Sequence, residues 1–96
     1  MKPSMALLHR EEMIREAVRR FRVCNPRVFG SVLHGTDAEG SDLDLLVDPL
    51  PETTLFDLGG LQLTLEGLLG VSVDVVTPGD LPERFRGAVV LEARPL

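Results

Sequence analysis

The stretch that decides the fold is Val28–Asp48, VFGSVLHGTDAEGSDLDLLVD, in which an apolar run, a Gly-Ser turn and two closely spaced carboxylates follow one another. Gly30-Ser31 lets the backbone turn tightly after the apolar run, into a short segment that ends at Gly35. If residues 31–35 form a helical turn, their free backbone N–H groups and the Ser31 hydroxyl point outward at a helix start. A helix start of this kind is a site for a phosphate group.

A second strand, Asp42–Val47, is predicted directly after Gly40-Ser41. Because side chains on a strand alternate between its faces, Asp42 and Asp44 share one face, and the apolar residues between them form a buried side. The Cα atoms of the two aspartates are then about 7 Å apart. Two partly desolvated carboxylates at this range repel each other and need a cation. Mg²⁺ or Mn²⁺ fits best, since no His or Cys stands beside them.

A third strand is predicted at Val71–Val76, with alternate valines on one side and Asp74 on the other. Taken alone, Asp74 is a solvent-facing residue on a half-buried strand. If this strand lies beside the second one with its valines on the same helix-packed side, Asp74 joins Asp42 and Asp44. Three carboxylates beside a phosphate-binding turn would indicate nucleotide chemistry.

Two helices are predicted to flank these strands. The first runs from Ser4 to about Arg22, where its apolar residues form one stripe, and it ends before Asn25-Pro26; the first strand then spans Arg27–Gly30. The second begins at Thr53 or Thr54 and ends at Leu69. Its predicted capping box pairs Thr54 with Asp57, and Gly70 is its stop signal.

Three smaller features follow from local signals. Asp48, before two prolines, either caps the next element or ends the strand. Gly59-Gly60, inside the second helix, indicates a bend or close packing in preference to a functional hinge. Residues 81–85 are predicted to form a short helical turn and residues 87–92 a last strand.

Composition limits the classes of function. Ninety-six residues make one domain, 1–96, with no room for a second domain that binds a substrate. A net charge of −5 argues against a long groove that holds nucleic acid electrostatically. The single cysteine, Cys24, excludes an internal disulfide and fits a reducing compartment. Since no segment resembles a membrane span or a signal sequence, we expect a cytoplasmic protein.

Taken together, Gly30-Ser31, Gly35 and the run Ser41-Asp42-Leu43-Asp44-Leu45 resemble the signature of the minimal nucleotidyltransferases, small members of the polymerase-β-like superfamily. The resemblance extends over nearly the whole chain. It implies an α/β fold, a small mixed β-sheet with helices packed on one face. It also implies two catalytic Mg²⁺ ions, with Mn²⁺ as the alternative, and ATP as substrate. In this family pattern the metal-binding and catalytic residues are Asp42, Asp44 and Asp74, and the nucleotide-binding residues are Gly30, Ser31, His34, Gly35 and Ser41.

One position departs from the family pattern. The family commonly has Ala-Arg before the second glycine, where this chain has Leu33-His34. A permanently charged side chain is thereby replaced by one that is largely neutral near pH 7 if unperturbed. Either His34 donates one hydrogen bond to the nucleotide, or the pocket is partly degenerate.

The small size also bears on the acceptor. With no domain to bind it, the acceptor must be brought by another polypeptide or by a second copy of this chain. The resemblance implies a co-encoded helical HEPN protein, for which this chain is the antitoxin that transfers AMP from ATP to a hydroxyl group. Two alternatives remain: a catalytically silent module that neutralises a partner by binding, and transfer to a small molecule or an RNA end. A homo-oligomer is a further expectation, because a short four-stranded sheet tends to leave an exposed edge.

Overall fold

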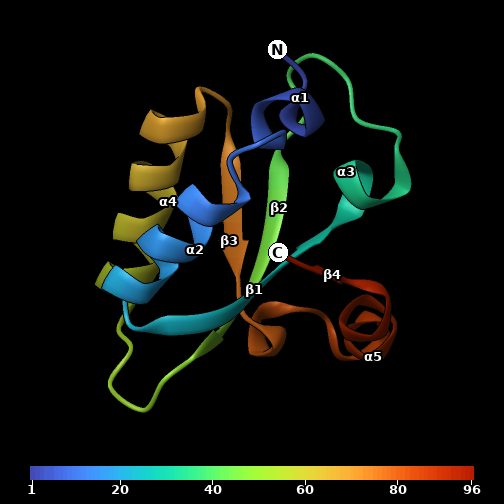
Figure 1. Ribbon diagram of the computed structural model, residues 1–96. Coiled ribbons are helices and arrows are strands. Elements are labelled where there is room, and N and C mark those ends of the chain that lie inside the picture. Colours follow the sequence, from blue (N-terminus) through green and yellow to red (C-terminus); the bar gives the residue numbers. More distant parts are fainter.

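A four-stranded mixed sheet with the strand order β3-β2-β1-β4 forms the centre of the computed structural model, which describes residues 1–96 (Figure 1). Strand β1 pairs antiparallel with β2 and with β4, and β2 pairs parallel with β3. The elements in chain order are α1 (Pro3–Leu7), α2 (Glu11–Arg20), β1 (Val23–Phe29), α3 (Gly30–His34), β2 (Leu43–Pro49), α4 (Leu55–Leu69), β3 (Val73–Val76), the 3₁₀ turn η1 (Pro78–Asp80), α5 (Glu83–Glu92) and β4 (Arg94–Pro95). The predicted α/β class with a small mixed sheet is confirmed.

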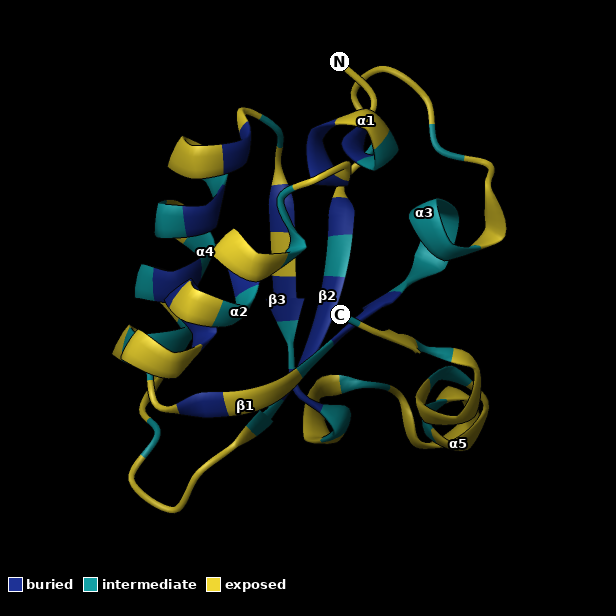
Figure 2. Ribbon diagram, in the orientation of Figure 1, coloured by how far each residue is buried: buried dark blue, intermediate teal, exposed yellow.

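The main core lies between one face of the sheet and helices α2 and α4, while α3 and α5 lie on the other side (Figures 1 and 2). Leu43, Leu45 and Val47 are fully buried on β2, as the predicted alternation requires. Val73 and Val75 of β3 continue this apolar face. The opposite face of β2 and β3 therefore carries Asp44 and Asp74.

The predicted single N-terminal helix is wrong: the chain forms two helices, α1 and α2, with a break at residues 8–10. His9 has a left-handed backbone conformation, with φ of 63°, which ends the helical path. Two side chains hold the ends of α1, one at its start and one at the break. The Asp37 carboxylate accepts the Ser4 N–H at 2.9 Å, and the Arg10 guanidinium donates to the carbonyl of Ala6 at 2.9 Å.

The first strand also begins earlier than predicted, at Val23, because α2 has already ended at Arg20. Pro26 does not terminate a helix but lies in an irregularity of the β1–β2 ladder between Cys24 and Arg27. A proline has no N–H for the ladder, so a bulge is where a strand can hold one.

Helix α4 confirms its predicted ends. Thr54 and Asp57 form the capping box, and Gly70 after the last turn is left-handed, with φ of 72°. A Cβ atom on Gly60 would come within 2.8 Å of Cε1 of Phe21, so close packing, the predicted alternative to a hinge, accounts for this glycine.

The prediction of a strand at residues 87–92 is wrong, because these residues belong to helix α5, and the last strand is only Arg94–Pro95. The short helical turn predicted at residues 81–85 overlaps the start of the same helix. Arg86 fixes this helix on η1 by donating to the carbonyls of Pro78 at 2.8 Å and Leu81 at 3.0 Å. These contacts fix the first turns of α5 and are not visible in the local pattern of residues 87–92.

Side chains of α4 cover the outer edge of β3. Two N–H groups that point away from β2 are occupied: Val73 donates to Glu66 at 3.0 Å and Val75 donates to Gln62 at 3.4 Å. The opposite edge of the sheet is β4, which has two residues, one of them Pro95.

Among the helices, none combines the length and the apolar character needed to cross a membrane.

Candidate active site

The candidate site begins with two carboxylates on neighbouring strands. Asp44 of β2 and Asp74 of β3 are direct partners in the parallel register, on the face opposite the main core. Asp42, one residue before β2, is exposed at the same end of the sheet. The strands thus place the three predicted aspartates together at one end of the open face.

The Gly-Ser turn meets the same carboxylates. Phe29, the last residue of β1, is the antiparallel partner of Asp44, so the following residue, Gly30, lies against the Asp44 side chain. Gly30 has φ of 72°, and a Cβ atom built on it would overlap the Asp44 carboxylate. Only glycine fits this position without moving Asp44.

The negative charges of the site are not balanced by cationic side chains. None of the ion pairs in the structure involves Asp42, Asp44 or Asp74. Burial, and next the charges of Asp74 and Asp42, raise the pKa of Asp44 to about 6. At neutral pH the site therefore concentrates negative charge that a bound cation would stabilise.

The donor set fits a hard divalent cation. The side chains at the site supply only carboxylate oxygens, the ligand type that Mg²⁺ and Mn²⁺ prefer. In their present rotamers, however, no three His, Cys, Asp or Glu side chains surround a common point. Asp42, Asp44 and Asp74 would have to turn toward one position to share an ion.

The predicted helical turn after Gly30 is present as α3, which begins without a side-chain cap. Gly35 ends it in a left-handed conformation, with φ of 71°. Ser41 lies in the loop before β2, where its hydroxyl accepts the N–H of Ala38 at 2.9 Å. The hydroxyl of Ser41 is thus already used to shape the loop, whereas Ser31 lies in the first turn of α3 beside Gly30.

His34 lies at the C-terminal end of α3 and contacts a residue that sequence reasoning missed. Its Nε2 atom is 3.1 Å from Oε1 of Glu92 on α5, and both side chains are about half exposed. No local sequence signal could have found Glu92, since the contact spans most of the chain. The His34 nitrogen that was predicted to bind a phosphate is therefore already in contact with a carboxylate.

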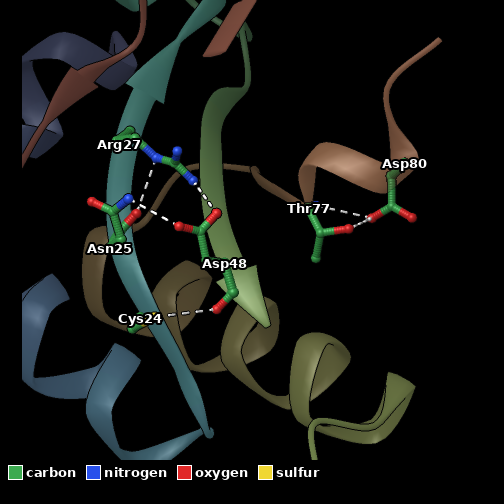
Figure 3. A network of polar contacts seen from close by, with 6 residues as sticks. All are labelled: Cys24, Asn25, Arg27, Asp48, Thr77 and Asp80. Carbon is green, nitrogen blue, oxygen red and sulfur yellow. Dashed lines mark hydrogen bonds and ion pairs between the residues drawn. The ribbon is translucent and has the colours of Figure 1, made fainter. Parts of the chain in front are cut away.

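The open face continues into a second polar cluster at the other end of β2, shown in Figure 3. The side chain of Arg27 is 8% exposed, and it donates to Asp48 Oδ1 at 2.6 Å. Asn25 donates to the other oxygen of Asp48 at 3.0 Å. Asp48 is therefore neither a helix cap nor a simple strand end, because it pairs with a buried arginine.

No closed cavity covers the carboxylates, and of the two hollows in the structure only the smaller lies beside one of them. One, of about 250 Å³, is next to Asp42, and the other, of about 490 Å³, lies at the N-terminal helix. The smaller is lined by Met1, Gly40, Ser41, Gly70, Val71 and Ser72, and the larger by Met1, Lys2, Met5, Leu8, Arg10 and Glu39.

Comparisons with known proteins agree with this geometry. Residues 11–96 match the family model of the nucleotidyltransferase domain. The chain is 37% identical over 89 residues to protein adenylyltransferase MntA of Thermococcus cleftensis, which covers 93% of this chain and 86% of the relative.

Solved structures give the same result. A minimal nucleotidyltransferase is similar with a TM-score of 0.86 and 45% identity, over 97% of this chain and 95% of the other. A toxin–antitoxin structure determined with AMP-PNP is similar with a TM-score of 0.74, over 88% of this chain and 70% of that one. At 23% identity, the second similarity shows the shared fold alone.

Proposed function

Because the chain belongs to the nucleotidyltransferase domain family, we propose that it transfers AMP from ATP to a hydroxyl group of a partner protein, as the antitoxin of a toxin–antitoxin pair. The observation that carries the proposal is the meeting of Asp44, Asp74 and the Gly30 turn at one point of the open face. A relative with this activity in its name, protein adenylyltransferase MntA, aligns over almost the whole chain.

In the proposed reaction, the oxygen of the acceptor hydroxyl attacks the α-phosphorus of ATP. The bond from that phosphorus to the pyrophosphate oxygen breaks, pyrophosphate leaves, and the hydroxyl proton is released. The N–H groups at the start of α3, with Ser31, bind and orient the phosphates, and Gly30 allows their close approach. Asp74, the more exposed of the two strand partners, faces the acceptor.

Asp42, Asp44 and Asp74 would hold the divalent ions, which we propose to be Mg²⁺. When bound, such ions neutralise the charge that develops on the attacking and leaving oxygens. Burial, and next the charges of Asp74 and Asp42, raise the pKa of Asp44, and a bound cation would offset both by stabilising the ionised carboxylate. No histidine base is needed, since positioning and charge neutralisation dominate phosphoryl chemistry of this kind.

We further propose that the acceptor belongs to a HEPN-type helical toxin encoded beside this chain. A toxin–antitoxin assembly is named for a neighbour of the same fold, and the relative that is 37% identical is named a protein adenylyltransferase. A direct test is to incubate the two proteins with ATP and Mg²⁺ and to measure the intact mass of the partner. We expect a mass gain of one adenylyl group, lost in Asp44→Asn and retained in Glu16→Gln, an exposed carboxylate on α2.

A catalytically silent antitoxin is the second candidate, and the contact between His34 and Glu92 favours it. If the anion-binding nitrogen stays occupied by Glu92, the chain would neutralise its partner by binding alone. An unchanged partner mass, together with full neutralisation by Asp44→Asn, would establish this candidate and reject the transfer reaction.

A further inference from the structure

Helix α4 has an apolar face that nothing in the chain covers. Its core side consists of Leu61, Leu65 and Leu69, all buried. On the opposite side, Phe56 is 90% exposed and Leu63 is 71% exposed. A helix that is apolar on both sides is expected to be buried on both sides. Helix α4 lies at the margin of the molecule in Figure 2.

This surface, called here the Phe56 face, consists of Phe56, Gly59, Leu63 and Gly67. These residues are spaced by three, four and four positions, so they form one straight stripe along the helix. A Cβ atom on either glycine would meet nothing within 4 Å, so each glycine leaves a hollow beside a large side chain.

The Phe56 face carries no charge, although the chain as a whole has a net charge of −5. On the flank of this face nearest β3, Gln62 and Glu66 are turned away to accept hydrogen bonds from the edge of that strand. Two copies of an acidic chain repel each other over most of their surfaces. At the Phe56 face they can approach without bringing like charges together.

We propose that the Phe56 face binds a second copy of this chain, with the two α4 helices antiparallel across a two-fold axis at Leu63. In this arrangement Leu63 packs on its own symmetry mate, and Gly59 lies opposite Gly67 of the partner. Phe56 then lies opposite Gly70, where a Cβ would also meet open space. The paired glycines let the two helix backbones approach around Leu63, and each Phe56 enters the open space beside Gly70, so the surface is complementary to itself.

The proposed dimer leaves both candidate active sites accessible. Helix α4 packs on the core face of the sheet, whereas Asp44 and Asp74 lie on the opposite face. A toxin can therefore approach each site of a dimer independently.

The sharpest test uses opposite charges at the two-fold axis. Leu63→Glu and Leu63→Lys should each be monomeric, since each places like charges against each other, and we expect dimerisation to weaken by about a hundredfold or more. An equimolar mixture of the two variants should form a heterodimer, detected by sedimentation velocity at concentrations where the wild type is dimeric. Circular dichroism should show that both variants remain folded.

Leu91, which is 88% exposed on α5, provides the matched control. Leu91→Glu should remain a dimer. A wild type that is monomeric at every concentration would overturn the proposal, as would a dimer that survives either Leu63 substitution. A monomeric chain whose toxin binding is abolished by Leu63→Glu would assign the face to the partner protein instead.

A cross-linking experiment tests the axis itself. In a Cys24→Ser background, Leu63→Cys places the two thiols next to each other, so mild oxidation should give a disulfide-linked dimer that runs at twice the monomer mass. Leu91→Cys should remain monomeric under the same conditions. Equal cross-linking of both variants would reject the symmetric arrangement.

Discussion

Asp44 and Asp48 lie on the same face of the same strand, yet the chain surrounds them in opposite ways. Asp48 pairs with the buried Arg27 and with Asn25. Although burial opposes ionisation, these hydrogen bonds and the arginine charge hold the pKa of Asp48 below its usual value. Asp44 is half-buried, and its charged neighbours are the acids Asp74 and Asp42, so its pKa rises to about 6.

Asp48 therefore contributes to the stability of the fold, whereas Asp44 prepares the site for a ligand. At the Asp48 end, each charge has a partner within the chain, and the strand margin is held together. At the Asp44 end, the chain leaves negative charge that only a ligand can balance. Concentrated and unbalanced charge of this kind is typical of functional sites.

The largest expected effect comes from Asp44→Asn. Removing this carboxylate should reduce AMP transfer by about a hundredfold or more, because a group that stabilises the transition state is lost. At pH 7 the same variant should be more stable than the wild type by about 1 kcal/mol, after allowance for solvent screening of a half-exposed charge. Mass analysis of the partner measures the first effect, and urea unfolding measures the second. A variant that loses both activity and stability would show that Asp44 stabilises the fold, as Asp48 does.

Removing the charged partner of Asp48 should lower the stability of the fold and leave AMP transfer nearly unchanged. Arg27→Met replaces the arginine with an apolar side chain of similar length and removes the pairing with Asp48. This change should lower the free energy of unfolding by about 2–3 kcal/mol. Urea unfolding at neutral pH measures this loss, with Arg20→Met on the exposed side of α2 as control. AMP transfer by the folded variant should stay near the wild-type rate, and a loss of stability no larger than in the control would show that the pair is not structural.

The two aspartates should also respond to pH with opposite signs. The pKa of Asp44 is about 6 in the folded chain against an ordinary 3.8, so the folded state binds this proton more tightly. Its favourable contribution is present at low pH and is lost as pH rises toward and through about 6. The contribution of Asp48 is present above its ordinary pKa and is lost as pH falls below it.

Urea unfolding as a function of pH separates these two contributions. The stability advantage of Asp44→Asn over the wild type should grow between about pH 4 and pH 7 and level off above, since the wild type alone pays for ionising Asp44. The deficit of Arg27→Met should shrink in acid. If the stability of the wild type and of Asp44→Asn changed with pH in parallel, the contribution of Asp44 would not have the predicted pH dependence.

The smallest effect is expected from Glu92→Gln, which removes the carboxylate at His34. Freed from this exposed contact, His34 should bind a phosphate better and raise the affinity for ATP by about two- to threefold. Isothermal titration calorimetry with Mg²⁺ present measures the change, and Glu83→Gln at the start of the same helix is the control. An affinity that falls in Glu92→Gln would mean that Glu92 supports nucleotide binding.

The parts of the molecule that local pattern determines could be predicted from the sequence. The alternation of Val73 and Val75 with Asp74 fixed which face the aspartate takes, and the capping box at Thr54 fixed the start of α4. Contacts between distant segments could not be predicted. The pairing of Arg27 with Asp48 depends on a bulge at Pro26, and the contact of His34 with Glu92 depends on α5 being a helix, which its β-branched residues disfavour locally.

The side-chain oxygens of Gln62 and Glu66 accept hydrogen bonds from two backbone N–H groups at the margin of β3, and this has a consequence for recognition. A foreign peptide that extended the sheet there would have to displace both side chains to reach the backbone N–H groups, and the other margin offers only two residues with a proline. Recognition by strand addition is therefore hindered on both sides. Partner choice in this chain must be encoded in side chains of its helices and loops, where single substitutions can change it without disturbing the sheet.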